Sequence, residues 1–186
     1  ISSNDKVVAL MPGSRKSEIQ KHWPIFLQTL DLLPKQSSHN IVPVLLEAPN
    51  VTIDDIPDNV ITTKENHYEI LSVADAAIVS SGTATLETAI LGCPMVVCYK
   101  LSSVTWFLAQ NMSSVKYLSL VNLISDKNVV KELLQNEMNA SNIAEQIIYL
   151  LSRDGRETTR AGYRELIHSL TSKTNPYKEA AKYILQ

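Results

Sequence analysis

The chain has 186 residues, a formal net charge of −2 at pH 7 and an apolar content of 45%, which fit one globular domain with a sizeable core. The nearly neutral charge lacks the basic excess of a nucleic-acid-binding surface, so we expect no nucleic-acid partner. No apolar run approaches the length of a membrane span. Cys93 and Cys98 would point to opposite faces of one strand, which argues against a disulfide or a shared metal and fits a reducing cytosol.

Short apolar runs alternate with amphipathic segments up to residue 100. Continuous apolar composition predicts buried strands over 6–11, 41–46, 60–62, 75–80 and 94–99. Apolar residues at helical spacing predict helices over 17–33, 65–74 and 83–91. Pro34 is expected to end the first helix, and Pro24 either kinks it or marks its true first turn. The alternation predicts an α/β fold with a doubly wound parallel sheet.

The pattern changes after residue 100. We expect a helix over 105–112, a short strand or extended piece over 117–121, and helices over 128–136, 141–152, 155–170 and 176–185. The basic residues of the last section lie on an amphipathic helical pattern with interspersed glutamates, which favours a solvated face over a binding surface. We therefore divide the chain into a domain at 1–153 and a helical tail at 154–186.

The stretch 80–87, Ser-Ser-Gly-Thr-Ala-Thr-Leu-Glu, lies between the fourth predicted strand and a predicted helix. Such a turn gathers free backbone N–H groups at a helix N-terminus, where the helix dipole favours phosphate or another anion. Gly82 allows close approach of the backbone, and Ser81 or Thr83 can cap the helix or donate to an oxygen. The same residues also fit a plain N-cap with a tight turn, and by themselves they do not separate the two interpretations.

A second turn, Pro12-Gly13-Ser14-Arg15, follows the first predicted strand. Ligands of open α/β sheets lie beyond the carboxyl ends of the strands, near the switch point in strand order, so both turns are suitably placed. Arg15 fits either a bidentate contact with phosphate or a plain surface position. The chain has no Walker A loop, no G-x-G-x-x-G fingerprint and no shared ligand spacing among its histidines, so we expect no metal, no cofactor and no catalytic set within it.

Five motifs occur in order along the chain. They are Val-Ala-Leu-Met-Pro-Gly-Ser-Arg-Lys-Ser-Glu-Ile at 8–19, Ser-Gly-Thr-Ala-Thr-Leu-Glu at 81–87, Cys-Pro-Met-Val-Val-Cys-Tyr-Lys at 93–100, Leu-Val-Asn-Leu-Ile at 120–124 and Lys-Glu-Leu-Leu-Gln at 131–135. Together they closely resemble the C-terminal half of lipid A disaccharide synthase, from about residue 7 through residue 153. The resemblance implies an inverting GT-B glycosyltransferase with two Rossmann-like domains, of which this one binds the nucleotide sugar.

The resemblance also implies the reaction and its partners. Such an enzyme transfers 2,3-diacylglucosamine from UDP-2,3-diacylglucosamine to 2,3-diacylglucosamine 1-phosphate and releases UDP, without a metal. Its catalytic base, an aspartate, and most of the acceptor surface are expected in the N-terminal domain. Because the chain begins with Ile1 rather than Met, we expect a fragment that binds UDP weakly and does not catalyse by itself.

Members of this family act at the cytoplasmic face of the inner membrane of Gram-negative bacteria. The apolar stretch 104–108 is the candidate for lipid contact, although packing of a helix on the sheet is the simpler interpretation. A homodimer is plausible by resemblance only.

The resemblance assigns eight residues to the donor site: Arg15, Ser81, Gly82, Thr83, Ala84, Glu87, Asn122 and Gln135. The arginine would face the diphosphate, the run 81–84 would offer it donors, and Glu87 would bind the ribose hydroxyls. Taken from the residues alone, Asn122 could read a base or ribose edge or satisfy a turn. Val121 stands where the family tends to have proline, which leaves the pose of Asn122 open.

Two other functions fit the same sequence. One is a UDP-N-acetylglucosamine epimerase or another GT-B enzyme, which also uses a Ser-Gly turn followed by glutamate, although the motifs at 93–99 and 132–135 tell against it. The other is a non-catalytic α/β module that binds a nucleotide or a protein partner.

Overall fold

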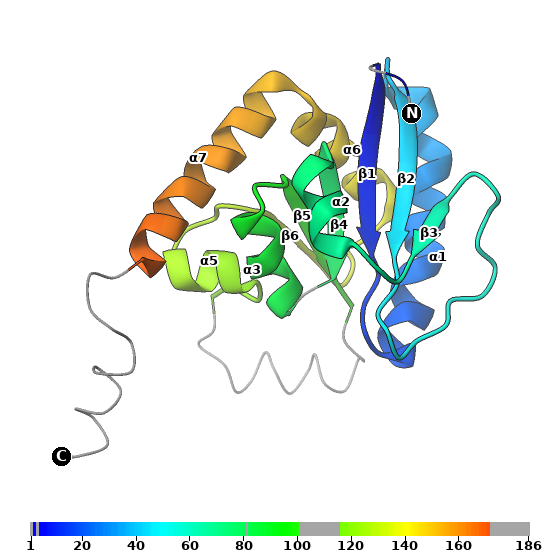
Figure 1. Ribbon diagram of the computed structural model, residues 1–186, viewed down its shortest axis with the longest axis horizontal. Coiled ribbons are helices and arrows are strands. Elements are labelled where there is room, and N and C mark those ends of the chain that lie inside the picture. The colour runs from blue at the N-terminus through cyan, green and yellow to red at the C-terminus, as the bar shows by residue number, and fades with distance from the viewer. Residues whose placement is uncertain (1, 3, 81, 101–115, 172–186) are drawn as a thin grey trace.

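The computed structural model describes residues 2, 4–80, 82–100 and 116–171. Within them six parallel strands form one sheet (Figure 1): β1 (Asp5–Met11), β2 (Asn40–Leu46), β3 (Ile61–Thr63), β4 (Ala76–Ser80), β5 (Met95–Tyr99) and β6 (Lys131–Leu134). The order across the sheet is β3-β2-β1-β4-β5-β6. This confirms the predicted doubly wound α/β fold, and the strand order reverses between β1 and β4.

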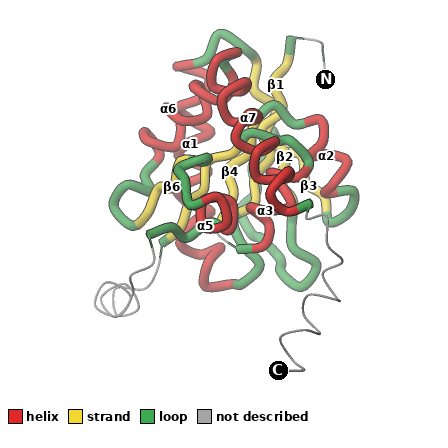
Figure 2. Tube along the Cα trace, turned by 90° about the vertical axis from the view of Figure 1, so that its left-hand side faces the viewer, coloured by secondary structure: helices red, strands yellow, loops and turns green. Residues whose placement is uncertain are grey.

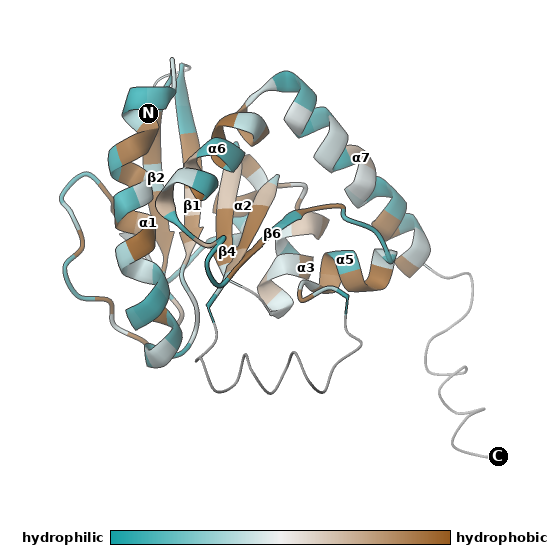
Figure 3. Cartoon of the chain, turned by 180° about the vertical axis from the view of Figure 1, so that it is seen from behind, coloured by the Kyte–Doolittle hydropathy of each residue, from teal (hydrophilic) through white to brown (hydrophobic). Residues whose placement is uncertain are grey.

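Helices cover both faces of the sheet (Figure 2). On one face lie α1 (Lys16–Gln36) and α6 (Ala140–Leu151). On the other face lie α2 (His67–Val73), α3 (Thr83–Ile90), α5 (Leu120–Ser125) and α7 (Arg153–Leu170). Because both faces are covered, the central strands are hydrophobic along their length, whereas α1 and α7 keep hydrophilic stretches (Figure 3). The result is a three-layer sandwich.

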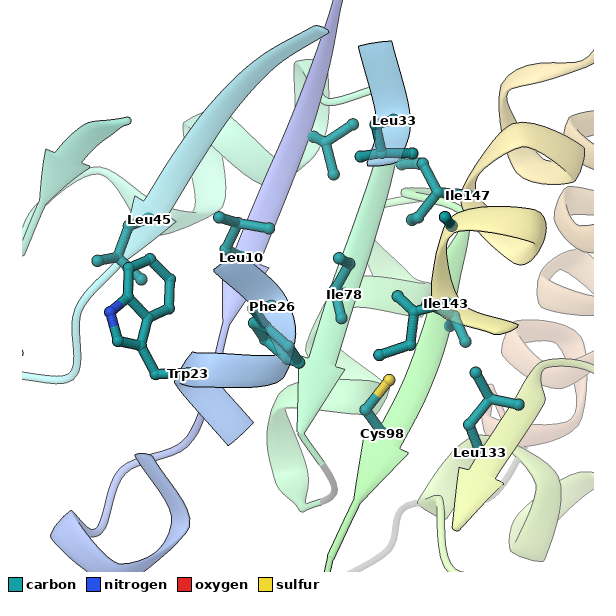
Figure 4. Close-up of a cluster of buried hydrophobic side chains, with 14 of the residues drawn as sticks. Leu10, Trp23, Phe26, Leu33, Leu45, Ile78, Cys98, Leu133, Ile143 and Ile147 are labelled. Atoms are coloured by element: carbon teal, nitrogen blue, oxygen red, sulfur yellow. The ribbon is translucent and has the colours of Figure 1, made fainter. Parts of the chain in front are cut away.

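The core under α1 and α6 is a continuous cluster of buried side chains (Figure 4). Phe26 and Leu33 of α1 and Ile143 of α6 are fully buried there beside Leu10 and Ile78 of the central strands. Burying one such side chain stabilises the fold by about 1.5–3 kcal/mol. The central strands are thereby held on both sides, which fixes the position of the turns that follow them.

The strands and helices predicted up to residue 99 are confirmed, with most ends shifted by one or two residues. The exception is α1, which begins at Lys16 and continues through Pro34 to Gln36. Pro34 lacks only one backbone donor, and burial of Leu33 beside it offsets that loss. Pro24 lies inside the helix and does not mark its first turn.

Two segments in the second half of the chain differ from the prediction. The segment 117–121 was expected as a short strand or an extended piece. No strand forms there: Ser119 is extended and caps α5, which begins at Leu120, by accepting a hydrogen bond from the backbone of Asn122. The segment 128–136, expected as a helix, contains β6, which pairs in parallel with β5. Short apolar segments carry too little periodicity to separate helix from strand, and pairing with β5 makes the second segment a strand.

The helices predicted over 141–152 and 155–170 are confirmed as α6 and α7. The helices predicted over 105–112 and 176–185, and the apolar stretch 104–108, lie outside the described residues. The division of the chain at 153/154 stays a prediction. It falls at the start of α7, whose Tyr163 and Leu166 share a buried cluster with β4 and β5.

The two cysteines lie in different buried clusters on opposite faces of the sheet, as the sequence predicts, and neither forms a disulfide. Burial raises the pKa of Cys93 to about 12 and also raises the pKa of Cys98, so both are neutral thiols. None of the described helices combines the length and apolar character that crossing a bilayer requires.

Candidate functional site

The turns after β1 and β4 lie side by side because these strands are neighbours. β1 and β4 pair in parallel from Val8 with Ala76 to Met11 with Val79, so both strands end at nearly the same level. Beyond these ends is a cavity of about 580 Å³, which we call the switch-point cavity. Its wall is formed by residues that follow β1 and β2, by the first residue of α2 and by the start of α3.

The start of α3 presents unpaired backbone donors to this cavity. Its N-cap is Gly82, at φ +129°, and no side chain of the described residues caps the helix. The hydroxyl of Thr85 donates to the carbonyl oxygen of Gly82, so it leaves the first amides of the helix free. Thr83 and Ala84 line the cavity at this point. The backbone here needs glycine for its φ rather than for space, because a Cβ on Gly82 would meet nothing within 4 Å.

Arg15 stands at the N-cap of α1 and lines the same cavity. Its guanidinium Nη1 lies 2.9 Å from Oε1 of Glu18, and Oε2 of Glu18 accepts from the backbone N–H of Ser14 at 3.2 Å. The Arg15 side chain is 75% exposed, and such an exposed ion pair stabilises by about 0–1 kcal/mol. The guanidinium can therefore exchange this partner for a ligand phosphate at little cost.

Glu87 lies one turn inside α3 and also lines the switch-point cavity. Within the described part of the chain its carboxylate has no hydrogen-bond or ion-pair partner. A half-buried carboxylate with free acceptor capacity suits a ligand that offers hydroxyl groups. Arg15 and Glu87 thus line one cavity, with the N-terminus of α3 in the same wall.

Several residues of the cavity were not found by sequence reasoning. Glu18 holds the turn that carries Arg15, and its spacing of three residues from Arg15 on a helix was the available signal. Ala48 and Pro49 line the cavity from the segment after β2. His67, one of the histidines that share no ligand spacing in the sequence, lines it from the start of α2, and its Nε2 is enclosed without a partner among the described residues.

The structure does not bring Asn122 to this cavity. Its side chain is fully buried, with Nδ2 donating to Val130 O and to Glu132 Oε1, both at 2.8 Å. Its Oδ1 accepts from the backbone N–H groups of Val129 and Val130. All four hydrogen-bonding positions of the amide are therefore taken by the protein, which supports a turn-stabilising role rather than the expected ligand contact.

Two further predicted residues, Gln135 and Ser81, are not among the described residues that line the cavity. Gln135 follows β6, two strands away from β4, in a left-handed conformation with φ +50°. Its backbone N–H donates to Tyr99 O, and its Nε2 is enclosed without a partner among the described residues. Ser81 lies outside the described residues. The roles of both stay predictions.

No group of three or more potential metal ligands occurs among the residues that the structure describes. A second cavity, of about 450 Å³, flanks the edge strand β6 between α6 and α7. None of the predicted donor-site residues lines it. The switch-point cavity combines the start of a helix, a cation and a carboxylate that is unpaired among the described residues, all at the carboxyl ends of the strands.

Comparison with known proteins identifies the family. The family profile described as lipid-A-disaccharide synthetase matches residues 1–185. The chain belongs to the lipid-A-disaccharide synthase family. A relative of that name from Syntrophus aciditrophicus is 37% identical over 172 residues, which cover 87% of this chain and 43% of the relative. The chain thus spans less than half the length of this family member.

Solved structures share the fold at low sequence identity. The spinosyn forosaminyltransferase SpnP matches with a TM-score of 0.61 and 15% identity, over 97% of this chain and 44% of that one. A putative UDP-N-acetylglucosamine 2-epimerase from Listeria monocytogenes matches with a TM-score of 0.58 and 10% identity, over 93% of this chain and 46% of that one. In both matches the chain covers less than half of a larger GT-B protein.

Proposed function

We propose that this chain is the donor-binding half of a lipid A disaccharide synthase and that the switch-point cavity holds the UDP portion of the donor. The observation that carries the proposal is that Arg15, the start of α3 and Glu87 line one cavity at the strand-order reversal. Family membership over almost the whole chain supports the choice of a UDP-sugar. The Rossmann-like fold by itself would fit many nucleotide ligands.

The chemistry of the cavity suits a nucleoside diphosphate. The diphosphate accepts hydrogen bonds from the backbone N–H groups of Thr83 and Ala84. The guanidinium of Arg15 leaves Glu18 and donates to the diphosphate, which is the stronger partner. Gly82, at the N-cap, lets the diphosphate approach the backbone closely. Glu87 accepts from the two ribose hydroxyls. The positive protein groups that contact the diphosphate also stabilise the negative charge that develops as UDP leaves, so binding and catalysis use the same contacts.

The full reaction needs a second half. We propose that an N-terminal domain supplies the catalytic base and most of the acceptor site, and that 2,3-diacylglucosamine passes from UDP to 2,3-diacylglucosamine 1-phosphate across the cleft between the halves. The whole enzyme would work in the cytoplasm at the inner membrane of a Gram-negative bacterium, with homodimers possible. This chain alone would bind UDP and not catalyse.

One alternative function has a supporting observation. The structural match to the putative UDP-N-acetylglucosamine 2-epimerase shows that such a protein shares this fold. At 10% identity this likeness shows the fold alone, whereas the curated relative at 37% identity is a lipid-A-disaccharide synthase. We therefore place transfer of an acylated sugar ahead of epimerisation, and both ahead of a non-catalytic binding module.

Calorimetric titration of the chain with UDP, ADP and UDP-N-acetylglucosamine tests the proposal. We expect binding of the uridine nucleotides, and a loss of roughly 10- to 100-fold in UDP affinity for Glu87→Ala, because a charged hydrogen-bond partner is removed. The control Glu145→Ala removes an exposed carboxylate from α6, away from the cavity, and should bind as the wild type does.

The outcomes separate the candidate functions. Absence of nucleotide binding would contradict the proposal and favour a protein-binding module. If UDP binds, adding a separately expressed N-terminal half with the acylated donor and acceptor distinguishes disaccharide synthesis from epimerisation. Disaccharide formation by this chain alone would contradict the assignment of the base to the other half.

A further inference from the structure

His22 is a fully buried polar residue whose ring touches the ends of three neighbouring strands. It projects from α1, and its Nδ1 lies 2.8 Å from the carbonyl oxygen of Pro12, just after β1. The same Nδ1 lies 2.9 Å from Oγ of Ser80, the last residue of β4. On the other side of the ring, the backbone N–H of Lys100, just after β5, donates to Nε2 at 3.1 Å.

These contacts allow one protonation state of the ring. Nε2 accepts a hydrogen bond from the N–H of Lys100, so it carries no proton of its own. A carbonyl oxygen can only accept, so the proton of the ring lies on Nδ1 and is shared by Pro12 O and Ser80 Oγ. His22 is therefore a neutral imidazole with its proton on Nδ1, and Ser80 cannot donate to it.

The hydroxyl proton of Ser80 is consequently available for another acceptor. The Ser80 hydroxyl has no other hydrogen-bond partner in the described part of the chain, and Ser80 lines the switch-point cavity although it is only 3% exposed. The next described residue is Gly82, the N-cap of α3. An anion at the start of α3 would thus find a hydroxyl donor in the floor of the cavity.

Resting on the proposed function, we propose that His22 is a positioning residue for the nucleotide. It holds the turn that carries Arg15 and the end of β4 that leads into α3 at one fixed spacing, and it turns the Ser80 hydroxyl toward the ligand diphosphate. A ligand with two linked phosphates requires both turns at a set separation, so their spacing matters for affinity.

The charged surroundings of His22 favour the neutral state on balance. Burial lowers the pKa of His22 below its ordinary 6.5, and the Pro12 carbonyl and the Glu18 carboxylate oppose this shift. Lys21 of α1 and Lys100 after β5 lower the pKa further, and the ring of Tyr99 lies 5.7 Å away. A second proton would set Nε2–H against the N–H of Lys100 and release the end of β5. Nucleotide affinity should therefore fall as the pH drops through this lowered pKa.

Two variants keep different halves of the ring's contacts. His22→Asn places an amide near the position of Nδ1 and can still donate to Pro12 or Ser80, whereas His22→Gln can reach the position of Nε2 and accept from Lys100. Ser80→Ala leaves the ring and removes the hydroxyl. We expect Ser80→Ala and His22→Gln to weaken UDP binding by about 3- to 10-fold and His22→Asn to weaken it less.

Thr29→Val is the matched control, since Thr29 is fully buried on the same helix and its hydroxyl donates to Ile25 O. It should lower stability and leave UDP affinity unchanged. Circular dichroism confirms that each variant is folded before titration.

Two measurements distinguish a positioning role of His22 from a purely structural one. Nitrogen-15 NMR of the ring in the wild-type chain should show a protonated Nδ1 and an unprotonated Nε2 near neutral pH. UDP affinity, measured from about pH 7.5 to about pH 5.5, should fall more steeply for the wild type than for His22→Asn. That comparison cancels protonation of the terminal phosphate of UDP itself, which also occurs at about pH 6, as in other terminal phosphate groups.

If the wild type binds UDP and the Ser80 and His22 variants match its affinity at every pH, the positioning role of His22 is wrong while the proposed function stands. A proton on Nε2 would have the same consequence. If the wild type does not bind UDP, the proposed function fails first, and the positioning role for a nucleotide fails with it.

Discussion

Met11 and Val79 are partners in register across β1 and β4, so the chain leaves both strands at nearly the same level on the carboxyl edge of the sheet. Each strand then enters a turn that leads to a helix, and the two helices lie on opposite faces. The cavity forms where the two paths diverge. This single pairing brings together Arg15 and Glu87, which are far apart in the sequence.

Arg15 should contribute to binding of the phosphate groups of UDP and not to binding of its nucleoside. Because its guanidinium donates to the diphosphate in our proposal, Arg15→Ala should weaken UDP binding by roughly 10- to 100-fold and leave uridine binding unchanged. Calorimetric titration of both ligands measures this difference. Arg164→Ala, an exposed change on α7, is the control. An equal loss for UDP and uridine would argue against the phosphate contact.

The turn after β1 should tolerate no side chain at Gly13. A Cβ there would lie 2.7 Å from Oε2 of Glu18, and the backbone has φ +133°. Gly13→Ala should lower the free energy of unfolding by about 1–3 kcal/mol and weaken UDP binding, because it displaces Glu18 and the turn that carries Arg15. Denaturant titration and calorimetry measure the two effects.

Gly92→Ala provides the matched control for this change. Gly92 also has a positive φ, +76°, but nothing lies within 4 Å of a Cβ there and it is outside the switch-point cavity. Its replacement should lower stability by about 1 kcal/mol and leave UDP affinity unaltered. Equal losses of UDP affinity in both variants would show that strain, rather than the turn geometry, causes the effect.

Asn122 should act on stability and not on ligand binding. Asn122→Ala removes an amide that makes four hydrogen bonds and leaves the backbone groups at Val129 and Val130 unpaired. We expect the free energy of unfolding to fall by about 2–4 kcal/mol, measured in urea. UDP affinity of the folded variant should match the wild type. A selective loss of affinity with unchanged stability would restore the donor-site role suggested by the family resemblance.

Stability should depend on pH through His22. Its pKa is lowered in the folded state, mainly by burial, so below about 6.5 the unfolded chain binds more protons than the folded one. The contribution of the neutral His22 ring to stability is therefore complete above pH 6.5 and is lost as the pH falls through the lowered pKa of the folded state. Urea unfolding at a series of pH values should show this decline, and His22→Asn should reduce it. An unchanged slope in the variant would assign the decline to other groups.

Sequence reasoning found the parts of the site whose signals are local. The turn at Gly13 and the turn at Gly82 each follow a continuous apolar strand and precede a helical pattern, and both signals lie within a few residues. Arg15 and Glu87 could be named for the same reason, with the family resemblance supplying their roles. Glu18 was missed because its partner is chosen by the conformation of the turn.

The tertiary structure decided whatever depends on neighbours distant in the chain. The segments that became α5 and β6 are short. Pairing with β5 makes 131–134 a strand, whereas α5 forms behind its N-cap Ser119. The residues around Asn122 fitted either a nucleotide contact or a turn, and folding pairs its side chain with the backbone of 129–130. His22 looked like any scattered histidine, yet it joins the ends of three strands. Local sequence determines backbone preference over a few residues, whereas burial and hydrogen-bond partners depend on which strands become adjacent.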